Sequence, residues 1–143
     1  MLIPQLILRQ LYTNGSLVNL ENCIQFQLKN RLADAKLLSV KEICIDDKKV
    51  DLEKVKIIFN NGSKYSIEDV YNKSIDFPLR KILQINIDGL QLSEEKHKIR
   101  ISFKAEPFGK LTLKVEDSIA ADTTHITRIP RDNEDDYGKK GNK

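Results

Sequence analysis

The side chains best suited to acid–base chemistry near neutral pH are two histidines, His97 and His125. An imidazole titrates near pH 6.5 and can exchange a proton under physiological conditions. His97 follows Glu94-Glu-Lys at the start of a predicted strand, and we interpret it as a solvated residue there. His125 lies in the run Thr123-Thr-His-Ile-Thr127, where we expect a surface group that could reach a partner.

The motifs of metal sites and of nucleophilic catalysis are missing from the sequence. It contains no Cys-x-x-Cys, His-x-His or His-Glu-x-x-His pattern, no Gly-rich phosphate loop and no serine in a nucleophile motif. Adjacent acids occur at Asp46-Asp47, Glu94-Glu95 and Asp135-Asp136. Neighbouring side chains in a strand or turn point apart, so these pairs are typical of turn charges. We therefore expect no catalytic residue, metal ligand or cofactor in this chain.

The elements that would position any site are β-strands, because apolar and polar residues alternate with period two. This alternation occurs at residues 24–28, 55–59, 83–87, 99–103 and 111–115. Turn signals at Asn14-Gly15, Asn61-Gly62 and Asp88-Gly89 separate the runs, since Asn-Gly and Asp-Gly accept the positive φ of tight turns.

Two segments depart from the simple alternation. Residues 38–45 change phase, which a β-bulge near Lys41-Glu42 would reconcile, and the polar run 46–49 then closes a hairpin. Ser66 followed three residues later by Asp69 predicts one short helical turn. Together these patterns predict an all-β, jelly-roll-like antiparallel sandwich of seven or eight strands. We expect one domain at residues 1–130 and a flexible charged tail at 131–143.

Composition excludes several classes of protein. The chain has 143 residues with 24 basic and 21 acidic side chains, a net charge of +3, which does not favour nucleic-acid binding. No apolar run approaches the length of a membrane span, and the N-terminus lacks the basic region of a signal peptide. Cys23 and Cys44 lie in strand-like runs and are interpreted as buried thiols, although a disulfide between neighbouring strands is not excluded by sequence. We expect a cytoplasmic protein.

An ordered series of segments between residues 22 and 119 resembles the small (β) subunit family of the bacterial C-glycoside deglycosidases. The segments are Glu21-Asn-Cys-Ile-Gln-Phe-Gln-Leu28, the run 38–50, the run 59–70, His97-Lys-Ile-Arg-Ile-Ser-Phe103 and the run 108–119. One region departs from the family. Ala33 and Asp34 stand where the family carries an aromatic residue and an arginine, so substrate or partner contacts there would differ.

The resemblance implies an accessory subunit of a heteromeric carbon–carbon lyase. A larger TIM-barrel α subunit would carry the catalytic residues and a divalent metal of the Mn or Mg type, and higher hetero-oligomers could form. The reaction implied is cleavage of the bond between a 3-oxo-sugar and a flavonoid-type aglycone.

Candidate contacts with such a partner lie in the loop at Pro107 and Phe108, in the N-terminal run 2–8, and at His125 and Ile126 in the segment 120–130. Each of these is equally well explained by ordinary edge-strand packing. The alternatives to an accessory subunit are a carbohydrate-binding module that acts alone and a scaffolding sandwich. The first needs an aromatic platform, for which the chain offers four tyrosines, five phenylalanines and no tryptophan.

Overall fold

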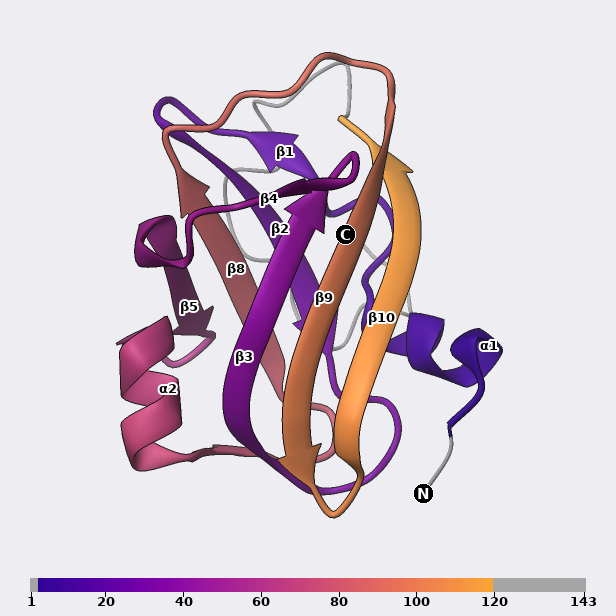
Figure 1. Ribbon diagram of the computed structural model, residues 1–143, viewed down its shortest axis with the longest axis vertical. Helices are drawn as coiled ribbons and strands as arrows, with labels where there is room; N and C mark the ends of the chain where they lie inside the picture. Colours follow the sequence, from indigo (N-terminus) through magenta and orange to yellow (C-terminus); the bar gives the residue numbers. More distant parts are fainter. Residues whose placement is uncertain (1–2, 120–143) are drawn as a thin grey trace, which may run out of the picture.

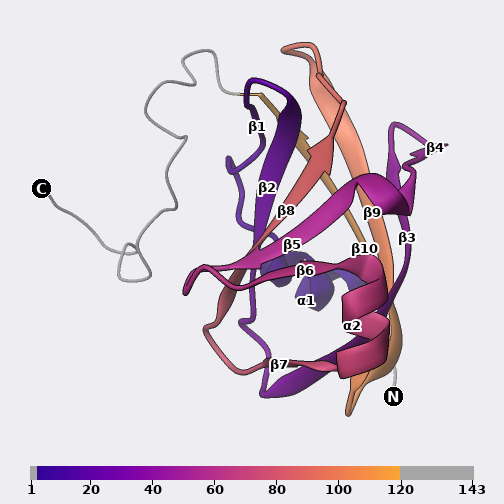
Figure 2. The ribbon, with the colours of Figure 1, turned by 90° about the vertical axis from the view of Figure 1, so that its left-hand side faces the viewer.

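The computed structural model describes residues 3–119, which fold into two antiparallel β-sheets packed face to face (Figures 1 and 2). The first sheet has the order β1 (Val18–Asn19), β2 (Cys23–Lys29), β8 (Ile82–Asp88), β5 (Val55–Phe59) and β6 (Lys64–Ser66). The second has the order β10 (Gly109–Ser118), β9 (Lys96–Glu106), β3 (Ala35–Ile45) and β4 (Lys48–Lys49), and β7 (Ile75–Phe77) also pairs with β3. The predicted all-β sandwich is confirmed.

The core lies between the sheets and is built by the predicted alternation. In β9, every second residue from His97 to Ala105 is buried, whereas the intervening residues are exposed or half-buried. The fully buried side chains come from both sheets and include Phe26, Phe59, Ile43, Ile101 and Leu113. Removing each such side chain from water stabilises the fold by about 1.5–3 kcal/mol. Cys23 and Cys44 are buried free thiols, as predicted.

The outer face of β2 carries polar side chains that are not open to solvent. Gln25 and Gln27 are buried, although the alternation assigns them to the polar side. The pairing of β2 with β8 sets Gln25 opposite Asn86 and Gln27 opposite Gln84, which is also buried. Side chains directly opposite one another in a sheet are in contact. We attribute the burial to this block of four amide side chains, whose members shield one another.

The irregular strand β3 contains the expected bulge. The register of β3 against β9 shifts between Val40 and Glu42, which confirms a bulge near Lys41-Glu42, and it shifts again between Leu37 and Ser39. The two extra residues bend β3 and change the phase of its side chains. Because of the shifts, the residues that follow, from Ile43 to Ile45, pair regularly with β9 up to the turn that ends the strand.

The predicted helical turn is the helix α2 (Ile67–Lys73), which closes one side of the sandwich beside β3 (Figure 2). Ser66 Oγ accepts a hydrogen bond from the Asp69 backbone N–H at 3.0 Å, and Asp69 Oδ2 accepts one from the Ser66 backbone N–H at 3.0 Å. This reciprocal capping box satisfies two backbone donors that the helix itself leaves open. Val70 anchors the helix by lying fully buried in the core.

A second helical segment, which the alternation does not predict, lies beside the edge strand β10 (Figure 1). It consists of α1 (Gln5–Leu8) and the 3₁₀ helix η1 (Arg9–Leu11); another 3₁₀ helix, η2 (Leu52–Lys54), precedes β5. The Gln5 side chain donates to the carbonyl of Thr112 and accepts from the backbone N–H of Lys114 at 3.3 Å. One amide side chain thus pairs with β10 as a neighbouring strand would, and it covers part of an open sheet edge.

The predicted tail at 131–143, and with it His125 and Ile126, lies outside the described residues. The boundary between residues 130 and 131 therefore stays a prediction. Among the helices of residues 3–119, none is long and apolar enough to cross a membrane.

Candidate functional site

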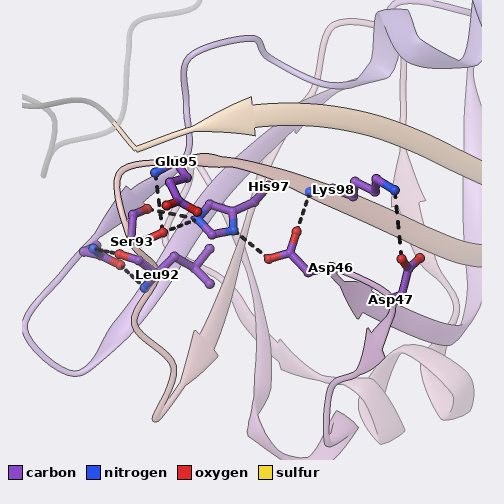
Figure 3. Close-up of polar contacts among 8 residues, drawn as sticks. Asp46, Asp47, Leu92, Ser93, Glu95, His97 and Lys98 are labelled. Carbon is purple, nitrogen blue, oxygen red and sulfur yellow. Dashed lines mark hydrogen bonds and ion pairs between the residues drawn. The ribbon is translucent and has the colours of Figure 1, made fainter.

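His97 meets the turn of the β3–β4 hairpin at one end of the sandwich (Figure 3). The turn consists of Asp46 and Asp47, with φ of 53° and 69°, between the paired residues Ile45 and Lys48. A two-residue turn with positive φ at both positions suits the twist of a hairpin, and Asp tolerates this conformation better than most residues. The predicted hairpin is confirmed, and its geometry directs the Asp46 carboxylate to the start of β9.

Both oxygens of the Asp46 carboxylate are hydrogen-bonded to β9. Oδ2 lies 2.6 Å from Nδ1 of His97, and Oδ1 accepts from the backbone N–H of Lys98 at 2.9 Å. The backbone N–H of Asp46 also donates to the carbonyl of Lys98 at 2.9 Å. The hydrogen bond with His97, followed by that from the Lys98 N–H, holds the pKa of Asp46 below its ordinary value. Asp46 is therefore an ionised acceptor at neutral pH.

The second nitrogen of His97 also faces an acceptor. Nε2 lies 2.9 Å from the carbonyl oxygen of Ser93 and 3.3 Å from the Ser93 hydroxyl (Figure 3). A carbonyl and an ionised carboxylate can only accept, so this arrangement is satisfied by an imidazole that is protonated on both nitrogens. Burial opposes the charge, but the hydrogen bonds to Asp46 and to the Ser93 carbonyl outweigh it and raise the pKa of His97.

This cluster contains a serine, a histidine and an aspartate, yet it is not arranged for nucleophilic catalysis. A catalytic histidine needs a free lone pair on Nε2 to take the proton of the serine hydroxyl. Here Nε2 lies nearer to the Ser93 carbonyl, which can only accept, than to the hydroxyl, so this geometry favours Nε2 as a donor. We conclude that His97 is a structural cation that joins the β3–β4 turn to the segment before β9.

The interpretation of His97 as a solvated residue is wrong, since only 7% of its surface is exposed. A usable signal was present in the sequence. His97 has the same parity as Ile99, Ile101 and Phe103, which point into the core. The charged residues on either side of His97 made it look like part of a polar run. They belong to the preceding loop and to the outer face of the strand, so they say nothing about the inner face.

A groove of about 630 Å³ lies over β9 and β10, bounded by the N-terminal segment and the β3–β4 turn. Its lining residues are Arg9, Asn14, Asp47, Lys98, Ile99, Arg100, Lys114, Val115 and Glu116. Four of these side chains are cations and two are anions. The groove is therefore the most basic hollow at this end of the sandwich, and it faces away from the buried imidazole.

Two of the predicted partner-contact residues, Pro107 and Phe108, lie far from this end of the molecule. Pro107 and Phe108 form the turn between β9 and β10, at the opposite end of β9 (Figure 1). Pro107 is exposed, whereas Phe108 is half-buried against the core. Their role in an interface stays a prediction. Within residues 3–119, no group of three or more His, Cys, Asp or Glu side chains is placed to hold a metal ion.

The fold and this geometry define a small two-sheet β-sandwich domain in which an imidazolium–carboxylate pair serves the structure and a basic groove lies beside it. The chain belongs to the family of hydroxymethylglutaryl-CoA reductase N-terminal domains, whose family model matches residues 7–120. No curated protein shows a significant match to the sequence.

The family match corrects the resemblance to C-glycoside deglycosidase small subunits, which is wrong, together with the flavonoid-type substrate attached to it. The physical reason is that the resemblance depended on an ordered series of alternating segments. Such alternation is required of any antiparallel sheet with one face on a core, so it does not separate one sandwich family from another. The barrel-shaped partner and its divalent metal were implied by the same resemblance, and nothing in the structure tests them.

Proposed function

We propose that this chain is a non-catalytic accessory domain that docks through α1 onto a catalytic polypeptide of the hydroxymethylglutaryl-CoA reductase type. Support for the partner comes from the family, which is named for the N-terminal domain of that enzyme. Support for the accessory role comes from His97, whose two nitrogens are both used to hold the fold together.

The observation that carries the proposal is a pair of large apolar side chains held in the open on α1. Leu6 is 72% exposed and Ile7 is 38% exposed. Adjacent exposed apolar side chains on an ordered element mark an interaction surface more strongly than scattered ones do. We call this pair the α1 apolar surface.

The α1 apolar surface is fixed in position by its neighbours. Leu8 and Leu11 are buried, and Gln5 is bonded to β10 at Thr112 and Lys114. Tyr12, just beyond η1, donates to Asp117 Oδ2 at 2.7 Å, and burial of the ring raises the pKa of this phenol, which keeps its proton. A preorganised surface loses little conformational entropy on binding.

A reduced cytoplasm is the compartment that this proposal assumes. Cys23 and Cys44 lie buried as free thiols in different sheets. Thiols persist where glutathione and thioredoxin keep them reduced. The carbohydrate-binding alternative would rest on Tyr71, an exposed ring on α2, and one ring is a small platform for a sugar.

The test is co-expression of the full chain, carrying an affinity tag, with the catalytic polypeptide of the reductase from its own organism. We expect the two to elute together. Leu6 is 72% and Ile7 38% exposed, so burying what remains of both contributes roughly 1.5–3 kcal/mol, and the double variant Leu6→Asp, Ile7→Asp should weaken the complex by at least about tenfold.

The matched control is Leu79→Asp. Leu79 is a 44% exposed leucine outside α1, so the variant introduces the same side chain at a similar exposure. We expect it to bind as the wild type does, and urea unfolding should show that all variants are folded. A wild-type chain that elutes alone, or a double variant that still binds fully, would contradict the proposal.

A further inference from the structure

We infer that the groove over β9 and β10 is a binding site for a small molecule that carries a diphosphate or an equivalent pair of phosphates. The inference stands apart from the docking of α1, because it uses different side chains and predicts binding by the isolated chain. Its starting point is the register of the β9–β10 hairpin, which places like charges opposite one another.

Two like-charge pairs lie directly across the hairpin. Lys114 pairs with Arg100, and Lys110 pairs with Lys104. All four side chains belong to the outer face, because their neighbours Ile101, Phe103, Leu111 and Leu113 are the buried ones. Like charges directly opposite in a sheet are destabilising. The repulsion between Lys114 and Arg100 therefore destabilises the folded protein, and an anion bound between them would relieve it.

Arg9 brings a third cation to the Lys114–Arg100 pair. It lies in η1, which the bonds of Gln5 and Tyr12 hold against β10, and it lines the same groove. Among residues 3–119, neither the Arg9 guanidinium nor the Lys114 ammonium has an ion-pair partner. The fold thus positions two uncompensated cations on one wall of the groove.

The acids near the groove only partly compensate the other cations. Asp47 lies 4.0 Å from Lys98, and both side chains are largely exposed. Glu42 is shared, since Lys49 lies 3.3 Å from one of its oxygens and Arg100 lies 3.4 Å from the other. Glu116 lies 4.0 Å from Lys96, a residue outside the groove. Exposed pairs at these distances are weak and can be displaced by a stronger anion.

Phosphate chemistry fits this donor set best. Arg100 and Arg9 present planar guanidinium groups that can bind two phosphate oxygens at once, and Lys98 and Lys114 add compact positive charges. The volume of about 630 Å³ is that of a small-molecule site. Val115 is half-buried, whereas Ile99 is 1% exposed and points into the core, so the apolar part of the lining is small. The groove therefore suits a molecule with clustered phosphates.

The probe for the test is inorganic pyrophosphate, titrated into the isotopically labelled full chain and followed by amide chemical shifts. We expect saturable shifts of Arg9, Lys98, Arg100 and Lys114. Acetate at the same ionic strength should give none that saturate. The double variant Arg9→Gln, Lys114→Gln should weaken binding at least about tenfold, because it removes both uncompensated cations.

The matched control is Lys104→Gln, Lys110→Gln, which removes two cations from the other like-charge pair of the same hairpin. We expect less than about a twofold change in affinity. An equal loss in both double variants would show attraction to net charge only and would overturn the site, as would a lack of saturable binding. If pyrophosphate binds in this way while the chain fails to associate with the reductase, the binding site is supported and only the docking proposal is contradicted.

Discussion

The inner and outer faces of β9 differ in how completely their positively charged side chains are partnered. His97, on the inner face, has an acceptor at each ring nitrogen, one from Asp46 and one from Ser93. Arg100, three residues later on the outer face, lies opposite Lys114 and shares its only carboxylate among the described residues with Lys49. A buried charge must be fully partnered for the protein to fold. An exposed charge carries no such requirement, so it can remain available to a ligand.

A substitution at Asp46 should disturb the inner-face contacts of β9 more than any other single change. Asp46→Ala removes the partners of the His97 Nδ1–H and the Lys98 N–H, and it places alanine at a φ of 53°. We expect the free energy of unfolding to fall by about 3 kcal/mol, of which about 1 kcal/mol is backbone strain. Urea unfolding measures the loss.

Asp47→Ala is the control for that variant, because Asp47 has a φ of 69° in the same turn and only an exposed ion pair to Lys98 at 4.0 Å. It should cost about 1 kcal/mol. If the two alanine variants are equally stable, the carboxylate of Asp46 does not hold the hairpin to β9.

The stability of the protein should also depend on pH through His97. Its folded-state pKa is raised above the ordinary 6.5, so its contribution is complete below pH 6.5 and is lost as pH rises through the folded-state value. The pKa of Asp46 is lowered below 3.8, so its contribution is complete above pH 3.8 and is lost as pH falls through the folded-state value.

The pair should therefore contribute most between about pH 4 and pH 6.5. His97→Gln should lose about 1–2 kcal/mol of unfolding free energy in that window and less above it. Unfolding free energies of wild type and variant between pH 4 and pH 9 measure this. A difference that grows with rising pH would have the wrong sign.

The smallest effect is expected on the outer face. Lys114→Gln removes one member of a like-charge pair, so we expect unfolding free energy to rise by roughly 0.2–1 kcal/mol at low salt. The gain should shrink as salt screens the repulsion. Thermal unfolding at two ionic strengths checks both statements. A loss of stability would mean that Lys114 has a favourable contact in the folded protein.

The elements of this fold could be predicted from local pattern, whereas the contacts between them could not. The alternation in β9 and β10, the bulge near Lys41, and the cap formed by Ser66 and Asp69 each depend on a few neighbouring residues. The pairing of Lys114 with Arg100 depends on the register of the β9–β10 hairpin. The contact of Asp46 with His97, 51 residues apart, depends on the separate, long-range pairing of β3 with β9.

Two features of the fold, the helix α1 and the buried outer face of β2, could not be predicted from the sequence for specific reasons. The four-residue helix α1 is too short to show a helical period, and it is held by Gln5 and Leu8 through contacts with β10 and the core. The outer face of β2 carries glutamines, whose polarity alone does not indicate burial, but each has an amide directly opposite in β8. In both cases, the deciding neighbour is distant in the sequence.

The structural role of His97 can be measured directly by the long-range ¹H–¹⁵N spectrum of its ring across a pH titration. A structural cation between Asp46 and the Ser93 carbonyl should be protonated on both nitrogens and should titrate with a midpoint above 6.5. A midpoint at or below 6.5, or a ring whose Nε2 lacks its proton while Nδ1 keeps one at pH 6, would contradict this role. It would instead leave His97 able to act as a base.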